Sequence, residues 1–252
     1  MTADVCVVIP TLGERPELLE SSVRSIRECG PDASLVVVAP ADRCAEIEPI
    51  VRRAGGHLVA QSGKGQSAAI NQGWAVHGGS ARYLTWLGDD DLLEPGSLER
   101  STAALNARPT ASMVVGTVRY IDLDGRPLFL FRPPPLYGPR LMRLGHNLMS
   151  QPGSLLRRTA VEVVGPLDET LRFAMDLDIF LRLARCGPIA RVDDVLASFR
   201  WHADSLTAGQ GDASEREAES VRRRYWSHPH VDVWLQRGAK GVTQLQYWWA
   251  KR

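Results

Sequence analysis

The chain has 252 residues, 44% of them hydrophobic and 23% charged. This balance is typical of a soluble globular protein and excludes a largely disordered or membrane-embedded chain. Thirty Lys and Arg residues against 29 Asp and Glu residues leave a formal net charge of +1, so the overall charge does not indicate binding to nucleic acid. The length suits one large α/β domain, or one domain with a small appendage.

The first residues lead directly into an apolar strand, without the basic region and length of a signal peptide. No apolar run approaches the ~20 residues that a membrane-spanning helix needs. The sequence therefore predicts a cytoplasmic protein without a transmembrane segment, and leaves open both oligomerisation and a peripheral contact with the inner face of a membrane. Four widely spaced cysteines without a CxxC pair argue against a thiolate zinc site and predict buried free thiols: Cys6, Cys29, Cys44 and Cys186.

Apolar runs alternate with helical segments through the first 98 residues. Residues 4–9 form an apolar run that ends at Pro10, as in a buried parallel strand, and 16–29 are predicted to be helical. Strands are also expected at 34–39, 57–60 and 82–87, with helices at 45–53 and 67–76. This alternation predicts a mostly parallel α/β sheet with helices on both faces and a ligand crevice at the carboxyl ends of the strands.

The pattern changes after residue 95. A helix is expected at 97–107, strands at 111–120 and 127–131, and a turn at 122–125. The prolines of Arg132-Pro-Pro-Pro135 predict a surface loop. From about residue 208 the sequence is polar and charged, which is typical of a solvated helix, and the chain ends in a tail with aromatic and basic residues that could contact a membrane, the protein body or a second copy: Tyr247, Trp248, Trp249, Lys251 and Arg252.

Three successive aspartates follow the strand expected at 82–87: Asp89, Asp90 and Asp91. A single aspartate there would be explained as a turn residue or helix cap, and this explanation stays open for Asp91. Three adjacent carboxylates raise each other's pKa unless a cation or strong donors compensate. Mg²⁺ typically binds through one or two carboxylates together with substrate phosphates. The cluster therefore predicts a divalent cation held at a bound diphosphate.

Six segments in a fixed order resemble one known family: VIPT (8–11), GKGQSAAINQGW (63–74), YLTWLGDDDLLEPGSL (83–98), QPGSLLRR (151–158), VGPLDETLRFAMDLDIFLRLARCG (164–187) and SFRWHADSLT (198–207). Together they resemble the family 2 glycosyltransferases with the GT-A fold. The resemblance implies inverting transfer of a sugar from a nucleoside-diphosphate sugar, above all a UDP-sugar, with Mg²⁺ or Mn²⁺. The acceptor would be a hydroxyl of a glycan, a lipid-linked molecule or a small molecule.

The resemblance also implies a division of the chain. The glycosyltransferase domain would span 1–207, with the nucleotide-sugar half at 1–98, the acceptor and catalytic half at 99–207, and a helical extension at 208–252. Within the second half, the proline loop and the segment 137–150 are expected to shape the acceptor site.

Roles follow residue by residue from the matched segments. Asp176 is expected to be the general base, with Asp178 as the alternative base or a supporting contact. The metal is expected at Asp90, Asp91 and His202. The acceptor side matches Gln151, Pro152 and Gly153. The nucleotide sugar is expected to contact Pro10, Thr11, Glu14 or the neighbouring Arg15, Asp42, Lys64, Gln66, Asn71 and Asp89.

Three positions depart from the family's pattern. Gly88 stands where many members have an aspartate, and Met175 replaces the glutamate before the base. Asp42 lies in an Ala-Pro-Ala-Asp stretch where the family usually has an Asp-Gly-Ser turn that holds the nucleotide base. The last departure leaves thymine and guanine nucleotides open beside uracil.

Two other classes of function compete with this prediction. A nucleotidyltransferase that makes nucleotide sugars would be expected to carry a glycine-rich basic loop after the first strand, which TLGERP (11–16) lacks. A sugar-nucleotide-binding module without activity is the second alternative. The departures from the family's pattern at Met175 and around Asp42 favour it.

Overall fold

The computed structural model describes residues 4–29, 33–133, 149–202 and 211–225. Residues 134 and 135 of the proline loop, nearly all of the segment 137–150, and the aromatic tail lie outside the described residues. The elements in chain order are β1 (Val5–Pro10), α1 (Pro16–Glu28), β2 (Ala33–Ala39), α2 (Cys44–Arg53), β3 (His57–Ala60), α3 (Gly65–His77), β4 (Tyr83–Trp86), β5 (Leu92–Leu93), α4 (Ser97–Ala107), β6 (Met113–Ile121), β7 (Pro127–Phe131), β8 (Leu155–Arg157), α6 (Arg158–Val164), α7 (Met175–Cys186), β9 (Ile189–Arg200) and α9 (Gly211–Arg224).

The first four long strands form the parallel sheet that the alternating pattern predicts. Their spatial order is β3-β2-β1-β4, and Val8 in the middle of β1 pairs with Val36 of β2 and with Trp86 of β4. All six residues of β1 are buried, because a parallel strand covered by helices on both faces has no solvent side. This burial explains the uninterrupted apolar run in the sequence.

The second half of the sheet is mixed. Strand β8 pairs antiparallel with both β4 and β6, while β9 runs parallel to β6. Strand β7 is antiparallel to β6, and the two-residue β5 is antiparallel to β9. The described strands thus follow the order β3-β2-β1-β4-β8-β6-β9-β5, with β7 beside β6. The parallel prediction holds for β1 to β4, and the later strands mix both directions.

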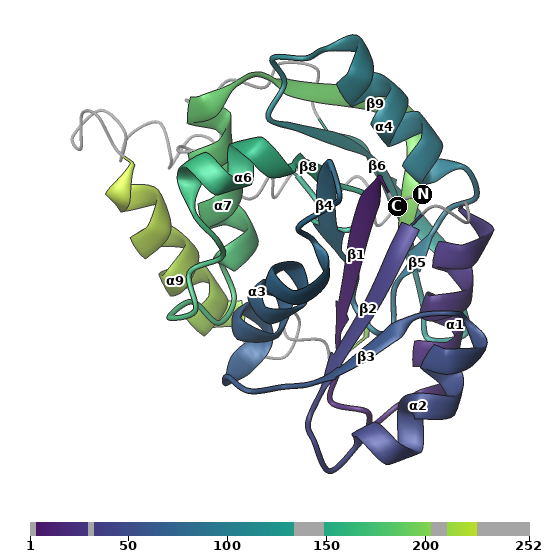
Figure 1. Ribbon diagram of the computed structural model, residues 1–252. Helices are drawn as coiled ribbons and strands as arrows, with labels where there is room; N and C mark the ends of the chain where they lie inside the picture. Colours follow the sequence, from purple (N-terminus) through teal and green to yellow (C-terminus); the bar gives the residue numbers. More distant parts are fainter. Residues whose placement is uncertain (1–3, 30–32, 134–148, 203–210, 226–252) are drawn as a thin grey trace.

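Helices cover both faces of this sheet (Figure 1). Alternate residues of β1 point to opposite faces. Val7 and Ile9 pack in a core with residues of α1, α2 and α4, whereas Val8 packs in a second core with residues of α3, α6 and α7. These two cores fix the positions of the strand ends that carry the predicted site.

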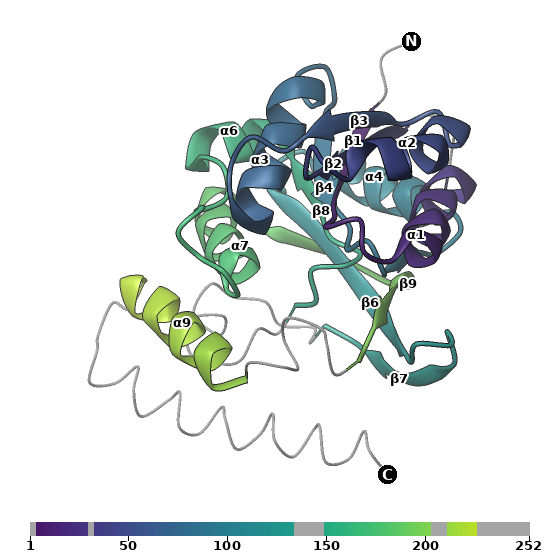
Figure 2. The ribbon, with the colours of Figure 1, turned by 90° about the horizontal axis from the view of Figure 1, so that it is seen from below.

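The C-terminal helix α9 belongs to the second core. The polar sequence after residue 208 predicted a solvated helix, and the helix is present, but Val221 is fully buried and Arg222 is buried beside it. Figure 2 shows α9 lying along the outer side of α7. The structure corrects the prediction on this point, because one side of α9 is packed against the domain.

All four cysteines are free thiols; Cys44 is half-buried and Cys186 is exposed. Cys6 and Cys29 are buried as predicted, whereas Cys186 is exposed at the end of α7, contrary to the prediction. Burial raises the pKa of the Cys6 thiol to about 12. No helix in the described part of the chain is both long and apolar enough to span a bilayer.

Candidate active site

The ends of neighbouring parallel strands bring the predicted nucleotide-side residues to one edge of the sheet. Thr11 follows β1, Asp42 follows β2 and Asp89 follows β4. The Thr11 hydroxyl donates a hydrogen bond to Asp89 Oδ2 at 2.5 Å and accepts one from the backbone N–H of Gly13 at 2.9 Å. Burial raises the pKa of Asp89, and the hydrogen bond from Thr11 opposes this effect. Thr11 therefore connects the end of β1 to the acidic turn.

A tight turn holds the three aspartates. The backbone N–H of Asp91 donates to the carbonyl of Gly88 at 3.2 Å, and the Asp91 side chain folds back under the glycine. A Cβ atom at position 88 would lie 2.7 Å from Asp91 Oδ2 and 3.1 Å from Asp90 Oδ1. A side chain at position 88 would therefore displace the carboxylates of Asp90 and Asp91 from their present positions.

Asp91 lies inside the protein. Its side chain is 3% exposed, and its Oδ1 accepts a hydrogen bond from the backbone N–H of Arg200 at 2.9 Å. Burial raises the pKa of Asp91 well above its ordinary value, and the neighbouring Asp90 charge raises it further. The Asp91 carbonyl accepts from Ser22 Oγ at 2.5 Å. These contacts attach the acidic turn to α1 and to the end of β9.

The short strand β5 sets which residues of β9 reach the acidic turn. Leu92 pairs with Ser198 in antiparallel register, so residues before Leu92 face residues after Ser198. Arg200 Nε accordingly donates to the carbonyl of Asp90 at 2.9 Å. Two residues further on, His202 Nε2 lies 2.9 Å from Asp90 Oδ2. The pairing brings together two of the three predicted metal ligands.

Asp90 and His202 have the chemistry of a divalent cation site. A carboxylate oxygen and an imidazole nitrogen that face each other suit Mn²⁺, and the carboxylate also suits Mg²⁺. The Arg15 guanidinium lies 3.4 Å from Asp90 Oδ2 and 3.1 Å from His202 Nε2. One Nε2 atom cannot donate to Asp90 and accept from Arg15 at the same time, and the buried Nδ1 of His202 has no hydrogen-bond partner among the described residues.

The protein contribution to such a site is small. Among the described residues, no group of three or more His, Cys, Asp and Glu side chains is arranged to hold a metal ion. Asp91, the third predicted ligand, is directed to Arg200. Two protein donors fit a cation whose remaining ligands are substrate phosphates and water, the usual environment of Mg²⁺ at a nucleotide.

The remaining nucleotide-side residues lie around the same edge. Glu14 and Asp42 are exposed in the loops after β1 and β2, Lys64 is exposed at the residue before α3, and Gln66 is half-buried in its first turn. Pro10 is the buried last residue of β1. The sequence named Arg15 only as an alternative to Glu14, yet Arg15 is the residue that reaches the acidic turn.

Asn71 makes structural contacts. Its Nδ2 donates to the carbonyl of Leu167 and its Oδ1 accepts from the backbone N–H of Leu167, both at 3.0 Å. The same Nδ2 lies 3.0 Å from Glu169 Oε1. The amide of Asn71 thus joins α3 to the loop that precedes α7.

The predicted acceptor-side segment lies beside the acidic turn. Gln151 Nε2 donates to the carbonyl of Trp86 at 2.7 Å, two residues before Gly88. Pro152 and Gly153 are buried behind it. Exposed tryptophans can stack against sugars. Trp74 and Trp86 pack edge to face inside the core, which excludes that role for them, while Trp201 is 40% exposed.

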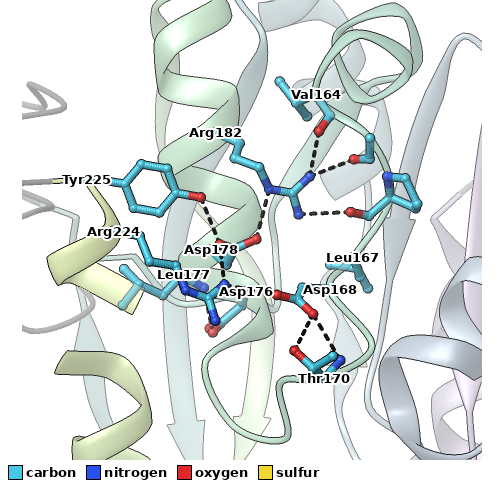
Figure 3. Close-up of polar contacts among 12 residues, drawn as sticks. Val164, Leu167, Asp168, Thr170, Asp176, Leu177, Asp178, Arg182, Arg224 and Tyr225 are labelled. Atoms are coloured by element: carbon cyan, nitrogen blue, oxygen red, sulfur yellow. Dashed lines mark hydrogen bonds and ion pairs between the residues drawn. The ribbon is translucent and has the colours of Figure 1, made fainter. Parts of the chain in front are cut away.

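Asp178 is the centre of a polar network (Figure 3). The side chain is 4% exposed; its Oδ2 accepts from Arg182 Nε and its Oδ1 from the Tyr225 hydroxyl, each at 2.8 Å. The Arg182 guanidinium also donates to the carbonyls of Val164, Gly165 and Pro166. Both oxygens of Asp178 are therefore engaged in holding α7 to its surroundings.

Asp176 occupies the second position of α7 and is half-buried. Its Oδ1 accepts from the backbone N–H of Leu177 at 2.7 Å. The preceding Met175 is 6% exposed, and Ser67 Oγ lies 2.9 Å from its sulfur. The position that carries a glutamate in the family thus points into the core here, next to α3.

Comparisons with known proteins agree with this fold. The model of glycosyl transferase family 2 matches residues 6–165. An uncharacterized glycosyltransferase of Rickettsia prowazekii is 24% identical over 212 residues, which are 81% of this chain and 65% of that protein. One of Rickettsia typhi is 25% identical over 149 residues, 57% of this chain and 46% of that protein. The chain therefore spans less than two thirds of these relatives.

Solved structures of TarS from S. aureus have the same fold. Its residues 1–349 in complex with UDP-GlcNAc match with a TM-score of 0.56 and 16% identity, covering 80% of this chain and 59% of that chain. The complex with UDP matches with a TM-score of 0.58 and 14% identity, covering 88% and 65%. The family model spans well over half of the 252 residues, so the chain belongs to glycosyl transferase family 2.

Proposed function

We propose that the protein is an inverting, metal-dependent glycosyltransferase that moves a sugar, a hexose or N-acetylhexosamine, from a nucleoside-diphosphate sugar to an acceptor hydroxyl. The observation that carries this proposal is the meeting of Asp90 and His202, 2.9 Å apart, beside the linked pair Thr11 and Asp89. The carboxyl edge of parallel strands is where α/β proteins bind nucleotides.

A UDP-sugar is the favoured donor. The related fold of TarS was solved with UDP-GlcNAc and with UDP, and in this chain the loops after β1, β2 and β4 follow the carboxyl ends of parallel strands. Asp90 and His202 would hold the cation, and Asp89, fixed by Thr11, would contact the nucleoside. When bound, Mg²⁺ or Mn²⁺ neutralises negative charge on the leaving diphosphate.

Asp176 is proposed as the base. Inversion by one displacement needs a carboxylate that removes the proton from the acceptor hydroxyl on the face of the sugar opposite the diphosphate. Asp176 is half-exposed near the N-terminus of α7, whereas both oxygens of Asp178 are engaged by Arg182 and Tyr225. We accordingly assign Asp178 a structural role and leave the proton transfer to Asp176.

Donor screening tests the proposal. Thermal-shift measurements with UDP-, dTDP- and GDP-sugars and MnCl₂ should select one nucleotide, because a ligand that binds only the folded state raises the melting temperature. The selected donor should then release nucleoside diphosphate with Mn²⁺ and not with EDTA. Asp176→Asn should retain the thermal shift and lose roughly 100-fold in turnover. A wild-type protein that binds the donor and never cleaves it would be a binding module.

A further inference from the structure

The segment that leads into α7 is held by a residue of the C-terminal helix. Glu217 of α9 accepts three backbone hydrogen bonds: from Arg172 at 3.1 Å through Oε2, and from Phe173 at 2.6 Å and Ala174 at 2.7 Å through Oε1. The contacts cross 43 to 45 residues of sequence. A single carboxylate thus binds three consecutive N–H groups immediately before Met175.

Glu217 binds the residues that lead into α7 and its N-cap Ala174, not the N–H groups of the helix itself, which begins at Met175. The first N–H groups of a helix have no acceptor inside the helix, and a side chain at the N-cap usually provides one. The N-cap of α7 is Ala174, and no side-chain cap hydrogen bond is formed there. The carboxylate of Glu217 acts on this end from another helix, and its negative charge also interacts favourably with the helix dipole.

The rest of α9 is anchored independently of Glu217. Val221 is fully buried in the core shared with α7. The Tyr225 hydroxyl donates to Asp178, and Arg224 pairs with Asp168 at 2.9 Å (Figure 3). Loss of the Glu217 carboxylate alone therefore leaves the helix several other contacts that keep it on α7.

Asp176 lies two residues after the segment that Glu217 binds. In this chain Met175 points into the core, so no acidic side chain precedes Asp176 on α7 itself. We propose that Glu217 is a positioning residue for Asp176: by holding the N–H groups of 172–174 it fixes the segment that enters α7, and with it the direction of the Asp176 carboxylate. This inference rests on the proposed role of Asp176 as the base.

The test compares Glu217→Gln with Glu219→Gln. Both changes remove one negative charge from α9, but Glu219 interacts within its own helix, with Arg223 four residues on and with the nearby Arg222. Hydrogen exchange of the free protein should become faster at 172–178 in Glu217→Gln and stay unchanged in Glu219→Gln. Unchanged exchange at 172–178 in Glu217→Gln would overturn the inference without touching the proposed function.

Kinetics then separate positioning from general destabilisation. With UDP-N-acetylglucosamine and MnCl₂, kcat for UDP release should fall roughly tenfold in Glu217→Gln because a small misalignment of a catalytic group is costly. The dissociation constant for UDP with MnCl₂, measured by calorimetry, should stay within about twofold of the wild-type value, since Glu217 makes its hydrogen bonds to residues 172–174 and not to the residues proposed to hold the nucleotide. A parallel loss of UDP affinity would contradict a role confined to Asp176.

A double variant tests whether Glu217 acts through Asp176. Residues that work through one another have non-additive effects, so Glu217→Gln should cause no further loss of kcat in an Asp176→Asn background. An equal loss of kcat from Glu217→Gln in both backgrounds would overturn the inference.

If Asp176→Asn itself turns over like the wild type, the assignment of the base fails, and this result is distinct from a failure of Glu217 to order residues 172–178. Glu217→Asp, which keeps the charge on a shorter side chain, should recover part of the exchange protection.

Discussion

His202 Nε2 lies 2.9 Å from Asp90 Oδ2, although 112 residues separate the two in sequence. The contact depends on two paired residues, Leu92 and Ser198, which fix the register between β5 and β9. The two-residue strand β5, together with the pairing of β9 to β6 up to Arg200, places His202 beside the acidic turn.

Replacement of His202 by alanine should weaken metal-dependent nucleotide binding. If the imidazole is one of two protein ligands, its loss should raise the dissociation constant for UDP with MnCl₂ by about tenfold or more, and leave UDP binding without metal nearly unchanged. Calorimetry measures both values. His57→Ala, on the exposed surface of β3, is the matched control and should bind like the wild type; equal affinity in His202→Ala would remove His202 from the site.

Thr11→Val should reduce both stability and nucleotide binding. Valine has a similar shape, but it leaves the half-buried Asp89 carboxylate and the buried Gly13 N–H without the hydroxyl that now binds both. An unpaired buried polar group costs about 1–3 kcal/mol, so urea unfolding should show a loss of this size in the free energy of unfolding. Thr11→Ser retains the hydroxyl and should stay close to the wild type. Similar stability of the serine and valine variants would show that the hydrogen bonds contribute little.

Gly88→Ala should disturb the acidic turn although it adds a single methyl group. The added Cβ would approach Asp91 Oδ2 to 2.7 Å and Asp90 Oδ1 to 3.1 Å, so the carboxylate must move. We expect the affinity for UDP with MnCl₂ to fall about tenfold. Gly79→Ala is the control, because nothing lies within 4 Å of the added Cβ there. The account of the turn is wrong if both variants bind UDP equally well.

Asp168 should make stability depend on pH. The Thr170 hydroxyl and then Arg224 hold the pKa of Asp168 below its usual range. A carboxylate whose pKa is lowered by folding stabilises the protein above the pKa of the unfolded chain, and this contribution disappears as the pH falls through the lower, folded value. Asp168→Asn should therefore cost about 0.5 kcal/mol at pH 7 for this partly exposed pair, and progressively less below about pH 4.

Denaturant unfolding from pH 7 to pH 3 measures this dependence. Asp124→Asn, which removes an exposed aspartate paired with Arg126, controls for the loss of one surface charge. A difference between Asp168→Asn and the wild type that is constant over this range would rule out the lowered pKa as its source.

Local patterns predicted the first half of the fold, through β4, well. Strand β1 and strand β2 are uninterrupted apolar runs that end at or just before a proline, and buried parallel strands have this pattern. Strand β9 was not predicted, because Asp193 and Asp194 are exposed in its middle and break the apolar run. Strand β5, with two residues, is too short for any periodicity.

The site was predictable only in part, because several of its contacts join residues that are far apart in the sequence. Three adjacent aspartates in the sequence indicate a cation site, but they do not show that Asp91 is buried against Arg200. The role of Glu217 has no local signal, since it arises from contacts with a segment more than 40 residues away and its helix has the composition of a solvated one. Contacts of this kind depend on tertiary packing, which a single sequence does not display.

The most direct test of the central claim is calorimetry of UDP binding to the wild type and to Asp90→Asn, each with and without MnCl₂. Asparagine keeps the shape of the side chain and its contact with His202 but removes the negative charge that would bind the cation. The account predicts that Mn²⁺ strengthens UDP binding by about tenfold or more in the wild type and has no effect in Asp90→Asn. Equal strengthening by Mn²⁺ in both proteins would contradict a metal site at Asp90.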